Sequence, residues 1–181
     1  MKRLGIYFFF DKDGIVDKYV DYVLEDLTKH VDKLIVVCNG QLNERGRKTF
    51  EKFTGNIIVR ENKGFDVWAY KTAIDSEGWN KLIEYDEIIL MNYTIMGPVY
   101  PLKEMFDIMD KRLELDFWGI TKCFQENSPV AQQIWQCPYG YIPEHIQSSF
   151  MAFRRSIVSS TIFQKYWDEM PMIKSYYESG G

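Results

Sequence analysis

Short apolar runs alternate along the chain with segments whose apolar residues recur every three or four positions. The first run is Leu4 to Phe10, and similar runs follow at Leu34 to Cys38, Ile57 to Val59 and Glu87 to Met91. Compact runs of this kind, rich in β-branched and aromatic residues, are typical of strands that are covered on both faces. We therefore expect four buried strands in the first half of the chain.

Helical periodicity fills the stretches between these runs. From Val16 to Val31 the apolar residues are spaced by three and four, which predicts an amphipathic helix. Further helices are expected at Asn43 to Phe53, Val67 to Ile74 and Leu102 to Met109. Alternation of strand and helix favours right-handed crossovers. The expected fold class is therefore α/β, a three-layer α/β/α, Rossmann-like arrangement around a mostly parallel sheet.

The second half of the chain is less regular. A strand is expected at Leu115 to Thr121, followed by a long loop at 122–143 with a short helix around Val130 to Trp135. Loops of that length in compact domains are often functional. Ser149 to Phe153 predicts a late strand and Ser156 to Met170 a closing helix. No repeat or linker divides the 181 residues, so the whole chain is interpreted as one domain.

Composition narrows the classes of function. A net charge of −4 without a long basic run argues against general nucleic-acid binding. Cys38, Cys123 and Cys137 are widely spaced without a C-x-x-C motif, so neither a disulfide framework nor a zinc site is expected. A reducing, cytoplasmic setting fits best. No run approaches the roughly 20 apolar residues that span a bilayer, so membrane association would be peripheral.

Polar segments follow the ends of the expected parallel strands, which is where open α/β sheets usually bind ligands. These segments are Asp11 to Gly14, Asn39-Gly40, Glu61 to Asp66, and Asn92 to Pro98. Because parallel strands end at the same edge of a sheet, the four segments are expected to lie along one rim.

The third of these segments suits a phosphorylated ligand. Asn62 and Asp66 offer hydrogen-bonding groups, and Gly64 permits a tight turn or a close backbone approach at the start of a helix. Arg60 and Lys63 could meet phosphate. The residues alone leave an alternative open, in which Asn62 and Asp66 only cap and begin the helix and Arg60 is solvated.

Longer motifs in the chain carry a resemblance to a known family. RENKGFDVWAYKTAI, DEIILMNYTIMGPVYPL, DFWGIT and EHIQSSFMAFRRSIV, in that order, resemble the rhamnan synthesis protein F family of bacterial glycosyltransferases. The resemblance runs from Leu4 to about Tyr177. It implies a GT-A-like domain that transfers a sugar, L-rhamnose from dTDP-rhamnose, to a glycan or lipid-linked glycan acceptor of the cell wall or surface. It further implies an inverting mechanism and a location in the cytoplasm, at the inner face of the membrane. It also implies that the chain is a short form or a C-terminally truncated fragment.

The resemblance also assigns binding residues. Asn62, Gly64 and Asp66 would help hold the nucleotide sugar, and Asn92 and Thr94 belong to the segment that positions the diphosphate, often through Mg²⁺ or Mn²⁺. The family pattern there is Asn-Asp-Ser, whereas this chain has Asn-Tyr-Thr and lacks the carboxylate that a hard divalent ion prefers. Metal use is therefore left open. Cationic substitutes are to be sought among Arg60, Lys63, His145, Arg154 and Arg155.

An inverting transfer needs a base that removes a proton from the acceptor hydroxyl. Glu144 is the first candidate because it begins the EHIQSSF motif, and Asp116, before Phe117, is the second. His145 and Gln147 are candidate phosphate or acceptor contacts, although a single histidine is also often structural. Trp118 could stack on a sugar or base.

Two other interpretations are kept. One is a catalytically degenerate GT-A domain that binds nucleotide or glycan, or that scaffolds polysaccharide assembly. The other is an unrelated α/β nucleotide-binding enzyme, which the absence of G-x-G-x-x-G and G-x-x-x-x-G-K-[ST] disfavours. A hydrolase triad is not expected, because Ser148 and Ser149 have no visible partner beyond His145.

Overall fold

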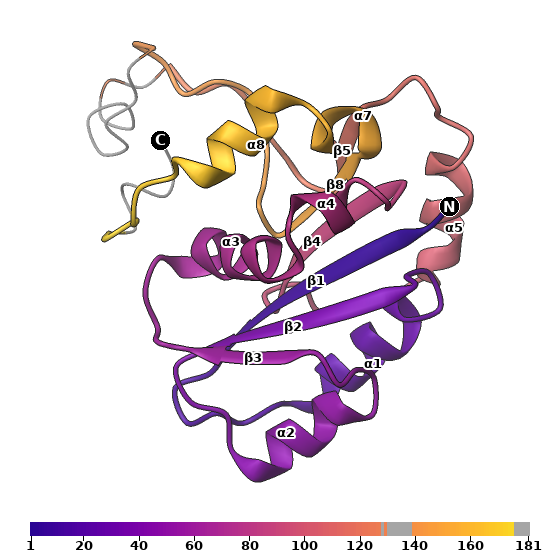
Figure 1. The fold of residues 1–181 in the computed structure, drawn as a ribbon, viewed down its shortest axis with the longest axis vertical. Coiled ribbons are helices and arrows are strands. Elements are labelled where there is room, and N and C mark those ends of the chain that lie inside the picture. Colours follow the sequence, from indigo (N-terminus) through magenta and orange to yellow (C-terminus); the bar gives the residue numbers. More distant parts are fainter. Residues whose placement is uncertain (128, 130–138, 176–181) are drawn as a thin grey trace.

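A six-stranded sheet forms the centre of the molecule (Figure 1). The computed structural model describes residues 1–127, 129 and 139–175. The strand order is β3-β2-β1-β4-β8-β5; β1 to β4 are parallel, and β8 is antiparallel to both β4 and β5. The mostly parallel sheet is therefore confirmed. The strands are β1 Arg3–Phe10, β2 Lys33–Asn39, β3 Ile57–Arg60, β4 Glu87–Asn92, β5 Phe117–Gly119 and β8 Phe150–Arg154.

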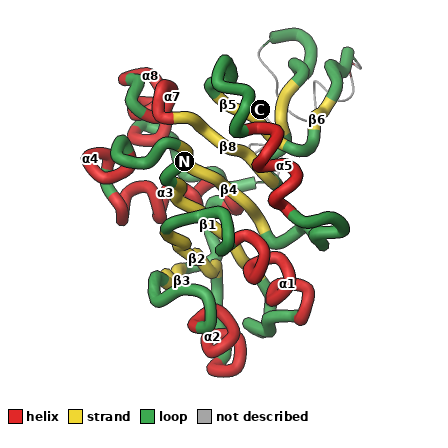
Figure 2. Tube along the Cα trace, turned by 90° about the vertical axis from the view of Figure 1, so that its right-hand side faces the viewer, coloured by secondary structure: helices red, strands yellow, loops and turns green. Residues whose placement is uncertain are grey.

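Helices cover both faces of this sheet, which gives the three expected layers (Figures 1 and 2). One layer contains α1 Lys18–Leu27, α2 Glu44–Glu51 and α5 Leu102–Met109. The other contains α3 Phe65–Glu77, α4 Trp79–Leu82, α7 Arg155–Val158 and α8 Thr161–Asp168. Within the described residues, no helix is long and apolar enough to cross a bilayer.

Two hydrophobic cores explain why the strands are apolar at nearly every position. Along β1, Tyr7 and Phe9 face the layer of α1, α2 and α5, whereas Leu4, Ile6 and Phe8 face the layer of α3. Successive side chains of a strand point to opposite faces, so a sheet covered on both sides needs apolar residues throughout. The continuous runs of the sequence follow directly from this arrangement.

The second half of the chain differs from the expectation in three places. The closing helix is divided into α7 and α8, because Ser160 begins α8 by accepting a hydrogen bond from Phe163 N. The strand expected at Leu115 to Thr121 shortens to β5. The expected loop instead contributes β6 Lys122–Cys123, which pairs with β7 His145–Ile146 in a separate two-stranded sheet. The short helix expected around Val130 to Trp135 lies outside the described residues.

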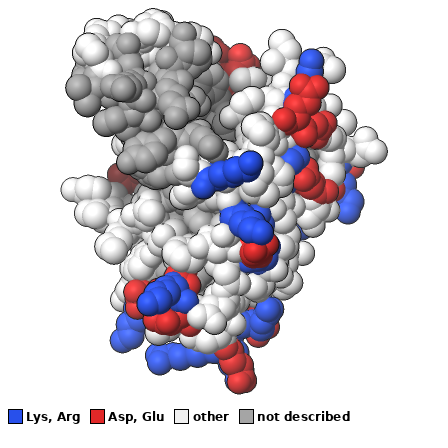
Figure 3. Space-filling view, turned by 90° about the vertical axis from the view of Figure 1, so that its left-hand side faces the viewer, with Lys and Arg blue, Asp and Glu red and all other residues white. Residues whose placement is uncertain are grey.

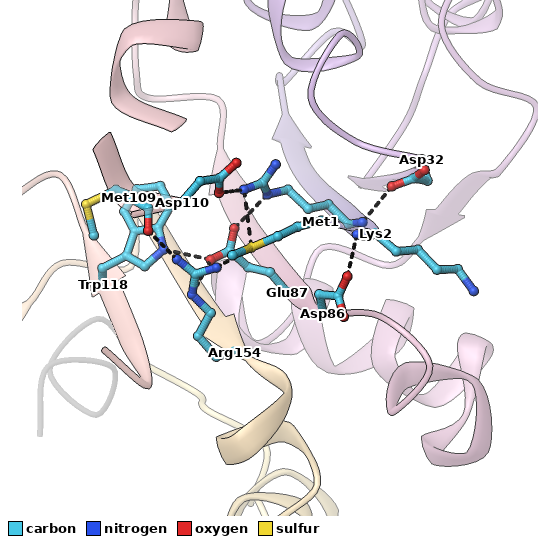
Figure 4. Close-up of polar contacts among 10 residues, drawn as sticks. Met1, Lys2, Asp32, Asp86, Glu87, Met109, Asp110, Trp118 and Arg154 are labelled. Carbon is cyan, nitrogen blue, oxygen red and sulfur yellow. Dashed lines mark hydrogen bonds and ion pairs between the residues drawn. The ribbon is translucent and has the colours of Figure 1, made fainter. Parts of the chain in front are cut away.

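A buried charge cluster joins β1, β4 and β8 at the edge where β1 to β4 begin (Figure 4). Glu87, which is 0% exposed, accepts a hydrogen bond from Arg3 Nε at 2.8 Å and another from Trp118 Nε1 at 2.7 Å. Arg154 Nε forms an ion pair with the same carboxylate at 3.0 Å, and Arg3 also contacts Asp110. These paired charges join β8 to β4 at the end of their ladder where β4 begins.

Candidate functional site

The four polar segments do lie along one rim, because β1 to β4 all end at the same edge of the sheet. Gln41 Nε2 donates to Lys12 O at 2.7 Å and joins the loops after β1 and β2. Asn39 Nδ2 donates to Phe65 O at 3.1 Å and joins the end of β2 to the start of α3. Figure 3 shows the molecule from this side, where acidic and basic side chains are interspersed over the described part of the face.

The turn between β3 and α3 depends on Gly64. Its φ is +74°, and a Cβ atom there would lie 2.5 Å from the Trp68 side chain, so only glycine fits. Arg60 Nη1 donates to Asn39 Oδ1 at 2.7 Å and to Lys63 O at 2.9 Å. Burial lowers the pKa of Arg60 from its ordinary value. Part of the Arg60 guanidinium is thus engaged in holding the turn, while Lys63 extends outward and pairs with Glu61 at 2.8 Å.

Asp66 lies at the centre of the rim. Its Oδ2 atom accepts hydrogen bonds from Asn92 Nδ2 at 3.1 Å and from Ser148 Oγ at 2.7 Å, and its Oδ1 accepts from Val67 N at 2.9 Å. Asn92 Oδ1 in turn accepts from Thr94 N at 3.1 Å and contacts the Thr94 hydroxyl. The structure therefore brings together Asp66, Asn92 and Thr94, three residues that the sequence nominated.

Ser148 is a residue of this site that sequence reasoning missed. From the sequence Ser148 was considered only as a nucleophile, although it stands in the EHIQSSF motif. Its carbonyl oxygen accepts a hydrogen bond from Tyr70 Oη at 2.9 Å, and the next residue, Ser149, accepts one from Asn92 N at 3.0 Å. Burial and the nearby Asp66 carboxylate raise the pKa of Tyr70 well above its ordinary value, so its hydroxyl remains a donor.

The segment that contains Glu144, His145 and Gln147 lies at the same edge of the sheet as the rim. They precede β8, whose first residue pairs with Met91 near the end of β4. Glu144 forms an exposed ion pair with Lys122 at 2.8 Å. His145 is exposed, with Nδ1 2.8 Å from the carbonyl oxygen of Pro143, and Gln147 Nε2 lies 3.1 Å from Cys123 Sγ. The chain links these residues to the centre of the rim through Ser148.

Asp116, by contrast, lies at the opposite edge. Its carbonyl oxygen accepts from Arg154 N at 2.8 Å, and Arg154 pairs with Glu87, the first residue of β4. Asn92 is the fifth residue after Glu87, which is about 17 Å along a strand. The structure therefore places the carboxylate of Asp116, the second candidate base, too far from Asp66 for the two to share a site. That carboxylate accepts a hydrogen bond from Ser156 Oγ at 2.6 Å instead.

Trp118, Arg154 and Arg155 also belong to that opposite edge. Trp118 is 5% exposed and donates to Glu87, so it cannot stack on a sugar or base. Arg155 donates to the carbonyl oxygens of Tyr85 and Glu84 and forms an ion pair with Asp86. Neither arginine is placed to meet a ligand at the rim.

Two shallow hollows lie at opposite edges of the sheet. One of about 360 Å³ is lined by Asn62 to Phe65 and by Met172 to Lys174, the segment after α8. Trp68 Nε1 holds this segment by donating to Pro171 O at 2.8 Å. The other, of about 490 Å³, lies at the opposite edge beside Arg154 and is lined by arginines already engaged within the protein. The smaller hollow is the one that adjoins the candidate site.

The residues at 92–94 do not fit a divalent metal ion. Asn92 Oδ1 already accepts from Thr94. Tyr93 has no carboxylate, and its ring packs against Phe8 and Phe9. Within the described ranges, no group of three or more His, Cys, Asp or Glu residues could hold a metal ion. A hard divalent cation needs several oxygen ligands. Residues 92–94 therefore offer no such set of ligands for the Mg²⁺ or Mn²⁺ whose use the sequence left open.

Comparison with solved structures agrees with the fold. The CMP:2-keto-3-deoxy-manno-octonic acid synthetase complexed with CTP matches with a TM-score of 0.52 at 13% identity, over 99% of this chain and 81% of that one. The glucosyl-3-phosphoglycerate synthase from Mycobacterium tuberculosis in complex with UDP matches with a TM-score of 0.50 at 12% identity, over 86% of this chain and 57% of that one. At such identities the likeness shows a shared α/β fold of the kind that nucleotide-sugar enzymes use.

Comparison of sequences places the chain in a family. It is 23% identical over 150 residues to the uncharacterized protein y4gN of Sinorhizobium fredii, a match that covers 82% of this chain and 35% of that protein. The chain thus spans about a third of the length of that curated relative. The model of the rhamnan synthesis protein F family matches residues 34–180. The chain belongs to the rhamnan synthesis protein F family.

Proposed function

We propose that the chain is a glycosyltransferase domain that binds a nucleotide-activated sugar at the rim where β1 to β4 end. The observation that carries the proposal is the meeting at this rim of Asp66 from α3, Asn92 from β4 and Ser148 from the segment before β8. Ligands of open α/β sheets bind beyond the carboxyl ends of the strands. Membership of the rhamnan synthesis protein F family supports L-rhamnose, carried by dTDP, as the donor sugar.

The donor is assigned to the β3–α3 turn and its neighbours. Asn62 and Lys63 line the hollow beside the turn, and Gly64 lets the backbone approach a bound group closely. Lys63 supplies a cation for the diphosphate, and Asp66, Asn92 and Thr94 form the floor of the site. Charge that develops on the departing nucleoside diphosphate would be stabilised by Lys63 and by main-chain N–H groups at this turn.

The transfer itself is an inverting single displacement. Glu144 removes the proton from an acceptor hydroxyl, the hydroxyl oxygen forms a bond to the anomeric carbon, and the bond from that carbon to the diphosphate oxygen breaks. Glu144 must exchange its partner Lys122 for the acceptor, which costs little because exposed ion pairs contribute at most about 1 kcal/mol. His145 and Gln147 are assigned to the acceptor side. A glycan or lipid-linked glycan acceptor would bring the domain to the inner face of the membrane.

A second candidate function is a degenerate domain that binds nucleotide or glycan without turnover. The observation that favours it is the missing carboxylate at Tyr93 together with the satisfied Asn92 side chain. Both candidates predict binding at the rim, and only the first predicts transfer.

The test is a calorimetric titration of the full chain with dTDP-rhamnose, dTDP, UDP-glucose and GDP-mannose, each with Mn²⁺ and with a chelator. Ligand binding to the native state raises the free energy of unfolding by about 2.7 kcal/mol at 100 times Kd, so thermal shifts check the titration independently. The proposed site is supported if the chain binds one nucleotide sugar selectively and Gly64→Ala abolishes that binding. Release of free nucleotide from that donor supports the transferase over the degenerate domain, and no binding of any of the four contradicts both.

A further inference from the structure

Ser148 connects the two halves of the proposed site. It follows the segment that carries Glu144 and His145, and its hydroxyl donates to Asp66 Oδ2 at 2.7 Å across 82 positions of sequence. A hydroxyl bonded to a carboxylate makes one of the stronger hydrogen bonds in proteins. The side chain is therefore placed to fix the direction in which Asp66 points.

The backbone around Ser148 is held from three sides. Tyr70, which is 0% exposed, donates to Ser148 O at 2.9 Å, and Asn92 N donates to Ser149 O at 3.0 Å. On the other side of Ser148, Gln147 N donates to Thr121 O at 3.0 Å. The Ser148 hydroxyl thus starts from a fixed backbone, and its bond to Asp66 does not have to order a loose loop.

Asp66 retains the capacity to accept a further hydrogen bond. An ionised carboxylate has about four lone-pair sites. Among the described residues three donors reach it, namely Val67 N, Asn92 Nδ2 and Ser148 Oγ. The side chain is half-buried, so one acceptor position remains for a ligand at the rim.

The chemistry of that ligand group follows from charge. A carboxylate repels the phosphates of a nucleotide unless a cation lies between them. In the part of the chain that the structure describes, the residues beside Asp66 do not form a divalent metal site. Asp66 is therefore suited to accept a hydrogen bond from an uncharged, hydroxyl-bearing part of the donor.

We propose that Ser148 is a positioning residue that, together with Asn92, aims Asp66 at the hydroxyl groups of the donor sugar. This inference rests on the proposed function. It assigns recognition of the sugar to Asp66 and Ser148, and recognition of the nucleoside diphosphate to the β3–α3 turn. A structural role for Ser148 alone would affect the two parts of the donor equally, and this difference makes the inference testable.

The experiment compares Kd values for a nucleotide sugar and for its nucleoside diphosphate, measured by calorimetry on the full chain. The probes are dTDP-rhamnose against dTDP, and UDP-glucose against UDP. Ser148→Ala is expected to weaken binding of the recognised nucleotide sugar about tenfold, as loss of one well-aimed hydrogen bond to a charged group would. Binding of the nucleoside diphosphate should change by less than about twofold.

Matched variants separate positioning from folding. Ser149→Ala removes a neighbouring hydroxyl that makes no side-chain hydrogen bond among the described residues, and should leave both Kd values unchanged. Ser148→Thr keeps the hydroxyl and should restore sugar binding. In a background of Asp66→Ala, Ser148→Ala should add no further loss, because the two side chains act through one interaction.

The outcomes are distinct. Equal weakening of sugar and diphosphate binding by Ser148→Ala, or no weakening of either, overturns the inference while the proposed function stands. An additional loss in the Asp66→Ala background also overturns it. If the unmodified chain binds neither these probes nor GDP-mannose, the proposed function fails, and the assignment of Ser148 to sugar recognition fails with it.

Discussion

Glu87 is a fully buried carboxylate between two arginines, and its removal should destabilise the fold without altering the rim. The side chains of Arg3 and Arg154 are 6% and 9% exposed, and both lie within 3.0 Å of a Glu87 oxygen. Glu87→Gln keeps the shape of the side chain but leaves two guanidinium groups without their shared counter-charge. Breaking a buried ion pair from one side typically costs about 3 to 5 kcal/mol.

For a chain of this size each kcal/mol shifts Tm by roughly 2 to 4 °C, so a fall in Tm of about 10 °C is expected. Urea denaturation gives the free energy of unfolding directly, provided that the slope m is the same in both proteins. Glu84→Gln is the matched control, because Glu84 pairs with Lys2 at 3.5 Å with side chains that are 65% and 49% exposed. Exposed pairs contribute about 0 to 1 kcal/mol, so this control should unfold close to the unmodified protein.

The position of Glu87 adds a second expectation. It lies about 17 Å from Asn92 along β4, so ligand binding by the folded Glu87→Gln protein should be unchanged below its melting range. A loss of stability under about 1 kcal/mol would refute the reasoning, since it would mean that the two arginines find solvent or other partners without cost.

Three further predictions address the site and the pH dependence. Gly64→Ala should lower the free energy of unfolding by about 1 kcal/mol or more and abolish nucleotide binding, because φ is +74° and the new Cβ would clash with Trp68. Gly55→Ala is the control: its Cβ would enter open space, so thermal melts and binding titrations should show no change. Glu144→Gln should reduce transfer at least about a hundredfold with donor Kd unchanged, while Asp116→Asn at the opposite edge should leave the rate of transfer intact; equal effects would contradict the assignment. Burial lowers the pKa of His30 below 6.5, so its neutral form is favoured in the folded state. The contribution of His30 to the free energy of unfolding should be complete above about pH 6.5 and should fall as the pH drops toward the lowered pKa. Urea midpoints measured across this pH range should fall less for His30→Gln than for the unmodified protein.

Much of the fold could be predicted because both faces of the sheet are covered. The apolar runs at Leu34 to Cys38 and at Ile57 to Val59 need no alternation when helices lie above and below them. The rim could be predicted for a related reason, since parallel strands that end together place their following loops together. That geometry alone brought Asp66 to Asn92, across 26 positions of sequence.

Asp116 was nominated for its place before Phe117 in the DFWGIT motif, without regard to its position in the sheet. β8 runs antiparallel to both β4 and β5, so β5 runs in the same direction as β4. A residue just before β5 therefore lies at the edge where β4 begins, whereas the rim lies where the parallel strands end.

Ser148 could not be assigned from sequence because its partner is set by a long-range pairing. The register that places Phe150 opposite Met91 also carries Ser148 past the end of β4, to the level at which α3 begins. One step of register along β8 would turn every side chain to the other face of the sheet and remove the hydroxyl from Asp66. The same register places Glu87 opposite Arg154 at the far edge, where the two side chains form the buried ion pair. The charge cluster at one edge of the sheet and the hydrogen bonds of Asp66 at the other are therefore separate consequences of one strand pairing.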